Sequence, residues 1–181
     1  MSELYLIKPS IKLAEEIWDY RQEYFNFGET HINGSCGISY FNVFDEWLEL
    51  VLSIEKNKLS RENVHASTFF SIRKFDNRII GSIQLRHTLT SELENHGGHI
   101  GYGIRPSERK KGYGKQQLSL VLDVAREMKI PKVMISCDKD NIASSRTAIS
   151  CGATLTNENY HNDKSQLIYW IDLTISNVVT H

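Results

Sequence analysis

Residues 99–115 read HIGYGIRPSERKKGYGK, and this stretch decides the fold. It begins as a strand with glycine at alternate positions, passes Pro106, turns through a glycine-containing loop and leaves as a helix. Such a turn presents unpaired backbone N–H groups and the positive end of a helix dipole to one point in space. Gly112 and Gly114 lack a Cβ atom, so an anion can approach the backbone closely there. The stretch therefore predicts an anion site between a strand and a helix.

Positive charge is concentrated in the same turn, where one acid, Glu108, faces five basic residues over positions 105–115. The basic residues are Arg105, Arg109, Lys110, Lys111 and Lys115. In a chain whose 21 basic and 22 acidic side chains nearly cancel, this concentration predicts a ligand with several phosphates. The spacing is neither that of a Walker A loop nor that of a three-glycine dinucleotide fingerprint. A solvated, lysine-rich turn is the alternative interpretation.

The hydrophobic pattern on either side of this stretch predicts the remaining elements. Before it we expect a strand over 3–8, a helix opened by Ser10, a second helix over 41–52, and strands over 68–73 and 79–86 joined through Asp76-Asn77. After it we expect a helix with an apolar stripe from Leu118 to Met128, a strand over 132–137, a helix over 142–151 closed by Gly152, and two strands within 154–173. The order predicts a mixed α/β (α+β) fold with a central, mostly antiparallel sheet of about six to seven strands flanked by helices.

Length and composition predict one domain over residues 1–173, with a C-terminal tail over 174–181. The three cysteines cannot all pair, and the N-terminus has neither a basic lead nor a long apolar run, so we expect a cytoplasmic protein without a membrane span. A net charge near zero and a basic patch without interleaved aromatic residues argue against a nucleic-acid partner. The oligomeric state is open, with a homodimer as one candidate.

The pattern Ile104-x-Pro106-x-x-Arg109-x-x-Gly112-x-Gly114 resembles the coenzyme A motif of the GNAT superfamily of N-acetyltransferases. The order of elements is similar to that fold over essentially the whole chain. Residues 86–87, 97–102 and 105–109 are also similar to a subgroup of predicted acetyltransferases that brings no substrate with it. The resemblance implies acetyl-CoA as cosubstrate and direct attack by a primary amine in a ternary complex. A coenzyme A-binding sensor or interaction module without catalysis is the alternative.

The resemblance also implies roles for particular residues. The strand ending at Ile104 is expected to splay from the strand over 132–137, so that the pantetheine arm lies between them and an N–H near 102–104 polarises the thioester carbonyl. Gly101 and Gly103 suit such a closely approached strand. The expected coenzyme-binding residues are Ile104, Arg109, Lys110, Lys111, Gly112, Tyr113, Gly114, Lys115, Asn141 and Ser144. For Asn141, capping of the following helix is an alternative role that can coexist with the first.

The catalytic groups are harder to assign. Many family members carry a tyrosine four residues before the glycine equivalent to Gly152, and here that residue is Ala148, so the usual general acid is missing. For the general base, His99 is the first candidate and Tyr102 the second, and a structural hydrogen-bonding role is the alternative for each. A zinc site at His87, His96 and His99 is not expected, because no fourth ligand is evident.

The acceptor pocket is implied to lie among residues 20–39, 41–52 and 160–170, which are rich in aromatic residues. Glu23 and Glu29 are candidates for attracting a cationic amine, although aromatic residues at helical spacing are typical of a core and helix carboxylates of a solvated face. An amino acid, a polyamine, an aminoglycoside-like compound and a peptide N-terminus all remain open as acceptors.

Overall fold

The computed structural model describes residues 2–57, 62–161 and 163–174. The strands are β1 (Leu4–Ile7), β2 (Ala66–Arg73), β3 (Ile79–Arg86), β4 (Ile100–Ile104), β5 (Lys132–Asp138), β6 (Thr154–His161) and β7 (Lys164–Asp172). The α-helices are α1 (Ala14–Asn26), α2 (Phe44–Asn57), α3 (Ser91–Asn95), α4 (Tyr113–Glu127) and α5 (Ile142–Ser150). Short 3-10 turns are η1 (Ile11–Leu13), η2 (Ile38–Tyr40) and η3 (Pro106–Glu108). The predicted mixed α/β fold is confirmed, whereas the predicted tail lies outside the described residues apart from Thr174.

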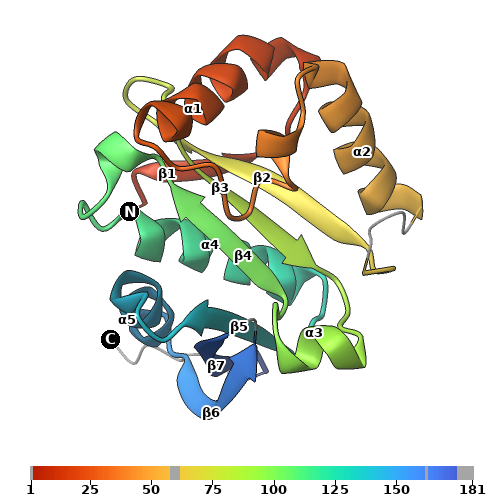
Figure 1. Ribbon diagram of the computed structural model, residues 1–181, viewed down its shortest axis with the longest axis vertical. Coiled ribbons are helices and arrows are strands. Elements are labelled where there is room, and N and C mark those ends of the chain that lie inside the picture. The colour runs from red at the N-terminus through yellow and green to blue at the C-terminus, as the bar shows by residue number, and fades with distance from the viewer. Residues whose placement is uncertain (1, 58–61, 162, 175–181) are drawn as a thin grey trace.

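The strands form two antiparallel sheets, β1-β2-β3-β4 and β5-β7-β6, instead of the single sheet that we expected. Helices α1 and α2 cover one face of the first sheet and α4 covers the other (Figure 1). Because helices lie on both of its faces, β2 is buried at every position and shows no alternation of polar and apolar residues. One core lies between α4 and the sheets, and a second lies under α1 and α2.

Within the described residues, the backbones of the two sheets are joined where β4 begins. Gly98 forms an isolated bridge with Ile135, and the His99 N–H donates to the Met134 carbonyl at 2.8 Å. From Ile100 onward β4 pairs with β3 alone among the described strands. The edge of β4 that faces away from β3 is therefore open from Ile100 onward, as the resemblance implied.

The apolar stripe of α4 is confirmed over most of its length, because Leu118, Val121, Leu122 and Ala125 are all buried. The prediction was wrong at Met128, which is 38% exposed. The helix ends at Glu127, and the left-handed residue that follows Met128 turns the chain away before a further core position is reached.

Other boundaries also differ from the prediction. The segment between β3 and β4, for which we expected no helix, contains the short helix α3, whose N-cap Thr90 accepts a hydrogen bond from the Leu93 N–H while the Leu93 side chain is buried. The second helix begins at Phe44, after the separate turn η2. Ser10 precedes the first helical turn but makes no side-chain cap bond. The β2–β3 turn has Asn77 in the left-handed region, as its sequence predicted.

None of the helices in the described ranges combines the length and apolar character that crossing a bilayer requires.

Candidate active site

The turn between β4 and α4 has the local geometry of an anion site. Gly112 is the N-cap of α4 with φ of +82°, and Lys110 is also left-handed, with φ of +64°. These two residues reverse the chain so that the first amides of α4 point out of the turn. The first turn of α4 contains no acidic side chain, so its N–H groups have no local carboxylate to accept from them.

A cavity of about 630 Å³ opens over this turn and reaches along β4 to α5. Every residue predicted to bind the coenzyme lines it, except Lys111. Those residues are Ile104, Arg109, Lys110, Gly112, Tyr113, Gly114, Lys115, Asn141 and Ser144. Arg146 and Thr147 of α5 also line it and were missed, because no local motif marks a helix residue that reaches a cavity from a different element. We refer to this space as the coenzyme cavity, after the ligand that the sequence resemblance implies.

The five basic residues of the turn are not equally available to a ligand. Arg109 is held by a two-pronged ion pair with Glu29, with N–O distances of 2.5 and 2.7 Å, and its Nε donates to the Ile104 carbonyl. Hydrogen bonding to Glu29 raises the pKa of Arg109, and the same bonds lower the pKa of Glu29. Arg105 bonds to Asp19 and Glu23 and is 3% exposed.

Lys111 is also engaged, since its ammonium lies 2.9 Å from the Glu108 carboxylate. Lys110, Lys115 and Arg146 line the coenzyme cavity, and no carboxylate of the described chain forms an ion pair with any of them. These three side chains are therefore the cations that a ligand in this cavity can reach without breaking an ion pair.

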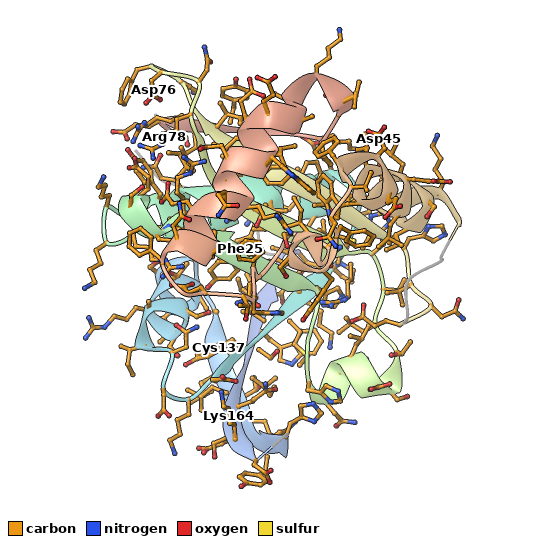
Figure 2. The ribbon with its side chains drawn as sticks, turned by 45° about the horizontal axis from the view of Figure 1, so that its top comes forward. Phe25, Asp45, Asp76, Arg78, Cys137 and Lys164 are labelled. Atoms are coloured by element: carbon orange, nitrogen blue, oxygen red, sulfur yellow. The ribbon has the colours of Figure 1, made fainter. Side chains whose placement is uncertain are left out.

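Glu108 lies at the centre of a buried charge network behind the turn. Its carboxylate is 3% exposed and accepts hydrogen bonds from Arg73 at 2.9 Å, Arg78 at 3.0 Å and Lys111 at 2.9 Å. Arg73 also binds Asp76, and Figure 2 shows Asp76 and Arg78 together at the β2–β3 turn. The network fixes the anion turn to the hairpin beside it.

The open edge of β4 carries backbone groups that β3 does not use. The Arg86 N–H donates to the His99 carbonyl and the Arg105 N–H donates to the Ile80 carbonyl, so the odd-numbered residues of β4 face β3. Antiparallel pairing alternates, so the N–H groups of Tyr102 and Ile104 point toward the open edge. The Ile104 carbonyl confirms this direction, since it accepts from Tyr24 and Arg109 instead of β3.

Gly101 and Gly103 serve a different purpose from the one we expected. An added Cβ on Gly103 would lie 2.9 Å from the Tyr24 hydroxyl and 3.0 Å from the Asn33 carbonyl. The Gly34 backbone lies against Gly101, where an added Cβ would meet its nitrogen at 3.6 Å. Gly103 therefore lets the loop after α1 pack closely onto the face of β4, whereas the 3.6 Å at Gly101 is an ordinary contact distance.

A second cavity, of about 640 Å³, lies beside β4 and is walled by the loop after α1, the end of α3, β5 and the β6–β7 hairpin. We call it the acceptor cavity. Asn33, Tyr102, Asn141 and Ser144 line both cavities, so the two spaces meet at these residues. None of the Phe, Tyr and Trp residues within 20–39, 41–52 and 160–170 is among the described residues that line it, and Tyr24 and Tyr169 are buried in the two cores.

Tyr102 places its hydroxyl at this junction. The oxygen lies 2.9 Å from Ser144 Oγ, and the hydroxyl donates to the Ser144 carbonyl at 3.2 Å. Burial raises the pKa of Tyr102 to about 12, so the phenol stays protonated at neutral pH. It is a hydrogen-bond donor and not a base under these conditions.

His99 lines neither of the two cavities. Its Nδ1 accepts from the Met134 N–H at 3.0 Å, and its ring lies edge-on to Trp170. Burial, with Arg86 and Lys132 nearby, lowers the pKa of His99 to about 4. The side chain is thus a neutral clamp between β4 and β5, which is the structural role left open for it.

His87 and His96, the other two histidines considered as zinc ligands, have separate partners. His87 Nε2 contacts Ser67 at 2.9 Å, whereas His96 stacks on His161 with ring centroids 3.7 Å apart. Within the described ranges no three His, Cys, Asp or Glu side chains are grouped so that they could hold a metal ion.

Asn141 caps α5 through its side-chain oxygen, which accepts from the Ser144 N–H at 3.1 Å. The same side chain lines both cavities. The capping alternative is therefore observed, and the residue also stands where a ligand could contact it.

Comparison with known proteins identifies the family to which this fold belongs. Residues 44–154 match the model of the acetyltransferase (GNAT) domain. No curated protein matches the sequence. Among solved structures, a ribosomal-protein alanine acetyltransferase from Vibrio fischeri has a TM-score of 0.70 at 14% identity, covering 95% of this chain and 94% of its own.

Two further structures have the same fold. The microcin self-immunity acetyltransferase, solved with acetyl-CoA and AMP, has a TM-score of 0.65 at 21% identity, covering 94% of this chain and 92% of its own. A dodecameric spermidine N-acetyltransferase from Vibrio cholerae has a TM-score of 0.67 at 14% identity, covering 99% of each chain. With a family match that spans more than half of the sequence and an anion turn beside an open strand edge, this chain belongs to the GNAT acetyltransferase family.

Proposed function

We propose that this protein transfers an acetyl group from acetyl-CoA to a primary amine, with both substrates bound at once. The observation that carries the proposal is the junction at Asn33, Tyr102, Asn141 and Ser144, where the coenzyme cavity and the acceptor cavity meet beside the open edge of β4. Two cavities that share a wall allow direct attack without a covalent enzyme intermediate. Solved relatives named for spermidine and for a ribosomal-protein alanine support an amine as acceptor.

The residues of the coenzyme cavity suit a phosphorylated ligand. Lys110, Lys115 and Arg146 supply positive charge that is not neutralised by a carboxylate, and the first amides of α4 add hydrogen-bond donors. The outward N–H groups of Tyr102 and Ile104 suit an extended, amide-containing arm that lies along the strand. The phosphates of acetyl-CoA and its pantetheine arm would thus be held by different parts of one cavity.

Acetyl-CoA, when bound, supplies an acetyl group that is activated as a thioester. A β4 N–H polarises the thioester carbonyl, the neutral amine forms the new C–N bond, the C–S bond breaks, and the amine releases its proton to solvent. The Tyr102 hydroxyl leaves its 3.2 Å bond to the Ser144 carbonyl and donates its one hydrogen bond to the departing sulfur. A phenol with a pKa of about 12 cannot fully protonate a thiolate whose conjugate acid has a pKa of roughly 8.5, so solvent completes that transfer.

Ala148 favours one alternative, a coenzyme A-binding module without catalysis. The residue is fully buried in the core beneath α5 and lines neither cavity, so nothing at that position can donate to the sulfur. The alternative differs from the enzyme in a single property, since it binds acetyl-CoA but releases no thiol.

The experiment that tests the proposal is a calorimetric titration with acetyl-CoA followed by a thiol-release assay over a panel of primary amines. Binding with amine-dependent release is the expected result. Binding without release supports the module, and no binding contradicts both. We propose the cytoplasm as the location and leave a homodimer as a prediction for sedimentation analysis.

Replacing Tyr102 with phenylalanine is expected to lower kcat by roughly ten- to thirtyfold, because the sulfur loses its hydrogen-bond donor while the ring remains. The dissociation constant of acetyl-CoA should change little. Steady-state thiol release and calorimetry measure the two quantities. Tyr5→Phe on β1 is the matched control and should leave both unchanged; an unaffected kcat in Tyr102→Phe would remove the hydroxyl from the mechanism.

A further inference from the structure

Glu23 and Glu29, the candidates from the sequence for attracting a cationic amine, already form ion pairs with arginines. Glu23 accepts from the Ser107 N–H and lies 3.3 Å from both Arg78 and Arg105. Glu29 is paired with Arg109. Neither glutamate lines the acceptor cavity. The negative charge available to a bound amine must therefore come from elsewhere.

Asp138 is the one carboxylate among the described residues that line the acceptor cavity. It lies at the end of β5, three residues before the junction residue Asn141. Its Oδ2 forms an ion pair with the exposed Lys164, whose Nζ lies 3.2 Å away, and its Oδ1 accepts from Gln166 Nε2 at 3.3 Å. The lysine is more exposed than the arginine partners of the two glutamates, and both distances exceed the length of about 2.7–2.9 Å that is usual for charge-assisted bonds. The carboxylate keeps acceptor capacity for a further N–H donor.

A second observation beside Asp138 also points to an N–H donor. The Oε1 atom of Gln166 is buried and has no hydrogen-bond partner in the described part of the chain. Buried polar atoms are rarely left without a partner. An amine that displaces the exposed Lys164 from Asp138 brings up to three N–H groups to the place where this carboxylate and the unsatisfied Gln166 oxygen lie together.

The rest of the cavity wall suits a different chemistry. Three imidazoles, of His31, His96 and His161, line it together with Arg86, whose guanidinium is paired with Glu62. Imidazole and guanidinium groups donate hydrogen bonds to carbonyl and carboxylate oxygens. Apart from Asp138, the described residues that line the cavity include no carboxylate for a second ammonium, and Glu62 behind the wall is paired with Arg86.

We infer that the acceptor presents a single amine, bound at Asp138, and carries a carbonyl or carboxylate that faces the imidazoles, as in an amino acid derivative or a peptide N-terminus. The inference rests on the proposed function and narrows it, since it excludes polyamines as the preferred substrate. The pKa values of amines agree with an α-amine as the acceptor group. An α-amine has a pKa of about 7.7–8.0, so much of it is neutral near pH 7.5 without an enzymic base, whereas a lysine-type amine has a pKa of about 10.4.

The test compares alanine amide with 1,4-diaminobutane and with butylamine in the thiol-release assay, with rates divided by the concentration of neutral amine. We expect kcat/KM for alanine amide to exceed that for the diamine by at least about tenfold, with butylamine between them. A diamine that equals or exceeds alanine amide overturns the inference and leaves acetyl transfer intact. If acetyl-CoA fails to bind, or no amine is used, the proposed function falls and the inference falls with it.

Asp138→Asn tests the assigned residue. It is expected to raise KM for alanine amide about tenfold, with the dissociation constant of acetyl-CoA unchanged. Asp140→Asn removes the same charge two residues away, outside both cavities, and should leave KM unchanged. Equal KM values in Asp138→Asn and wild type would contradict the amine site, and a parallel loss of coenzyme affinity would show that Asp138 acts on the fold.

Discussion

Glu108→Gln is expected to lower the free energy of unfolding by about 3 kcal/mol, because it removes the charge that compensates buried cations. Arg73 is buried, with a side chain 9% exposed, and after the change it retains only Asp76 as a charged partner. Arg78 keeps Glu23, and the exposed Lys111 can turn to water. The loss should therefore arise mainly at Arg73.

Urea denaturation at neutral pH measures this change. Glu127→Gln at the end of α4 is the matched control, since Glu127 is exposed and forms no ion pair among the described residues, and its free energy of unfolding should stay within about 0.5 kcal/mol of wild type. A Glu108→Gln variant as stable as this control would show that the network contributes specificity of turn conformation and not stability.

The same network predicts a pH dependence. Burial acts to raise the pKa of Glu108, but hydrogen bonds from Lys111 and Arg73 outweigh it and lower the pKa below its ordinary value. A carboxyl with a depressed folded pKa contributes stability that is present above its unfolded pKa, about 4.3, and is lost as pH falls through the folded pKa. The difference in free energy of unfolding between wild type and Glu108→Gln should therefore shrink below about pH 4. Urea denaturation midpoints measured from pH 7 to pH 3 would show this loss. A constant difference would contradict the assignment.

Gly112→Val is expected to weaken acetyl-CoA binding on the order of a hundredfold. A β-branched residue at φ of +82° is strained by roughly 1–3 kcal/mol, and the turn can relieve the strain only by rotating the amides that point at the ligand. An ideal Cβ at this position meets no protein atom within 4 Å, so the change acts through the backbone and through the space left for the ligand, and not through a clash within the fold.

Calorimetry with acetyl-CoA measures the loss of affinity. Gly152→Val is the matched control, because Gly152 has φ of +88°, also has no protein atom near its ideal Cβ, and lies outside the coenzyme cavity. Both variants should lose similar stability, while only Gly112→Val should lose affinity. Equal affinities in the two variants would remove the turn from the coenzyme site.

Features with a local signal could be predicted from the sequence. The anion turn was predicted because glycines, a proline and a change from strand to helical periodicity fall within 99–115. The α4 stripe and the left-handed Asn77 followed from the same kind of information. The missed helix α3 also had a local signal, since Thr90 followed by two acidic residues at 92 and 94 is typical of a helix start.

Charge assignments were less reliable, because they depend on partners that are distant in sequence. Arg109 and Lys111 were grouped with Lys110 and Lys115 as equivalent phosphate ligands, yet the first two form ion pairs with Glu29 and Glu108. His99 is the first candidate for a base in the sequence, but in the structure its Nδ1 accepts a hydrogen bond from Met134 of the neighbouring sheet.

The order of elements, the strand–turn–helix geometry of 99–115 and the resemblance to the family follow from the sequence alone, because each depends on residues that are neighbours along the chain. Only the tertiary structure decided which cations remain free, that Tyr102 and Ser144 meet at the junction, and that Asp138 is the carboxylate of the acceptor cavity. The physical reason is that electrostatic and hydrogen-bonding partners are chosen in space. Arg109 and Glu29 lie 80 residues apart and yet neutralise each other, which no pattern within 99–115 could reveal.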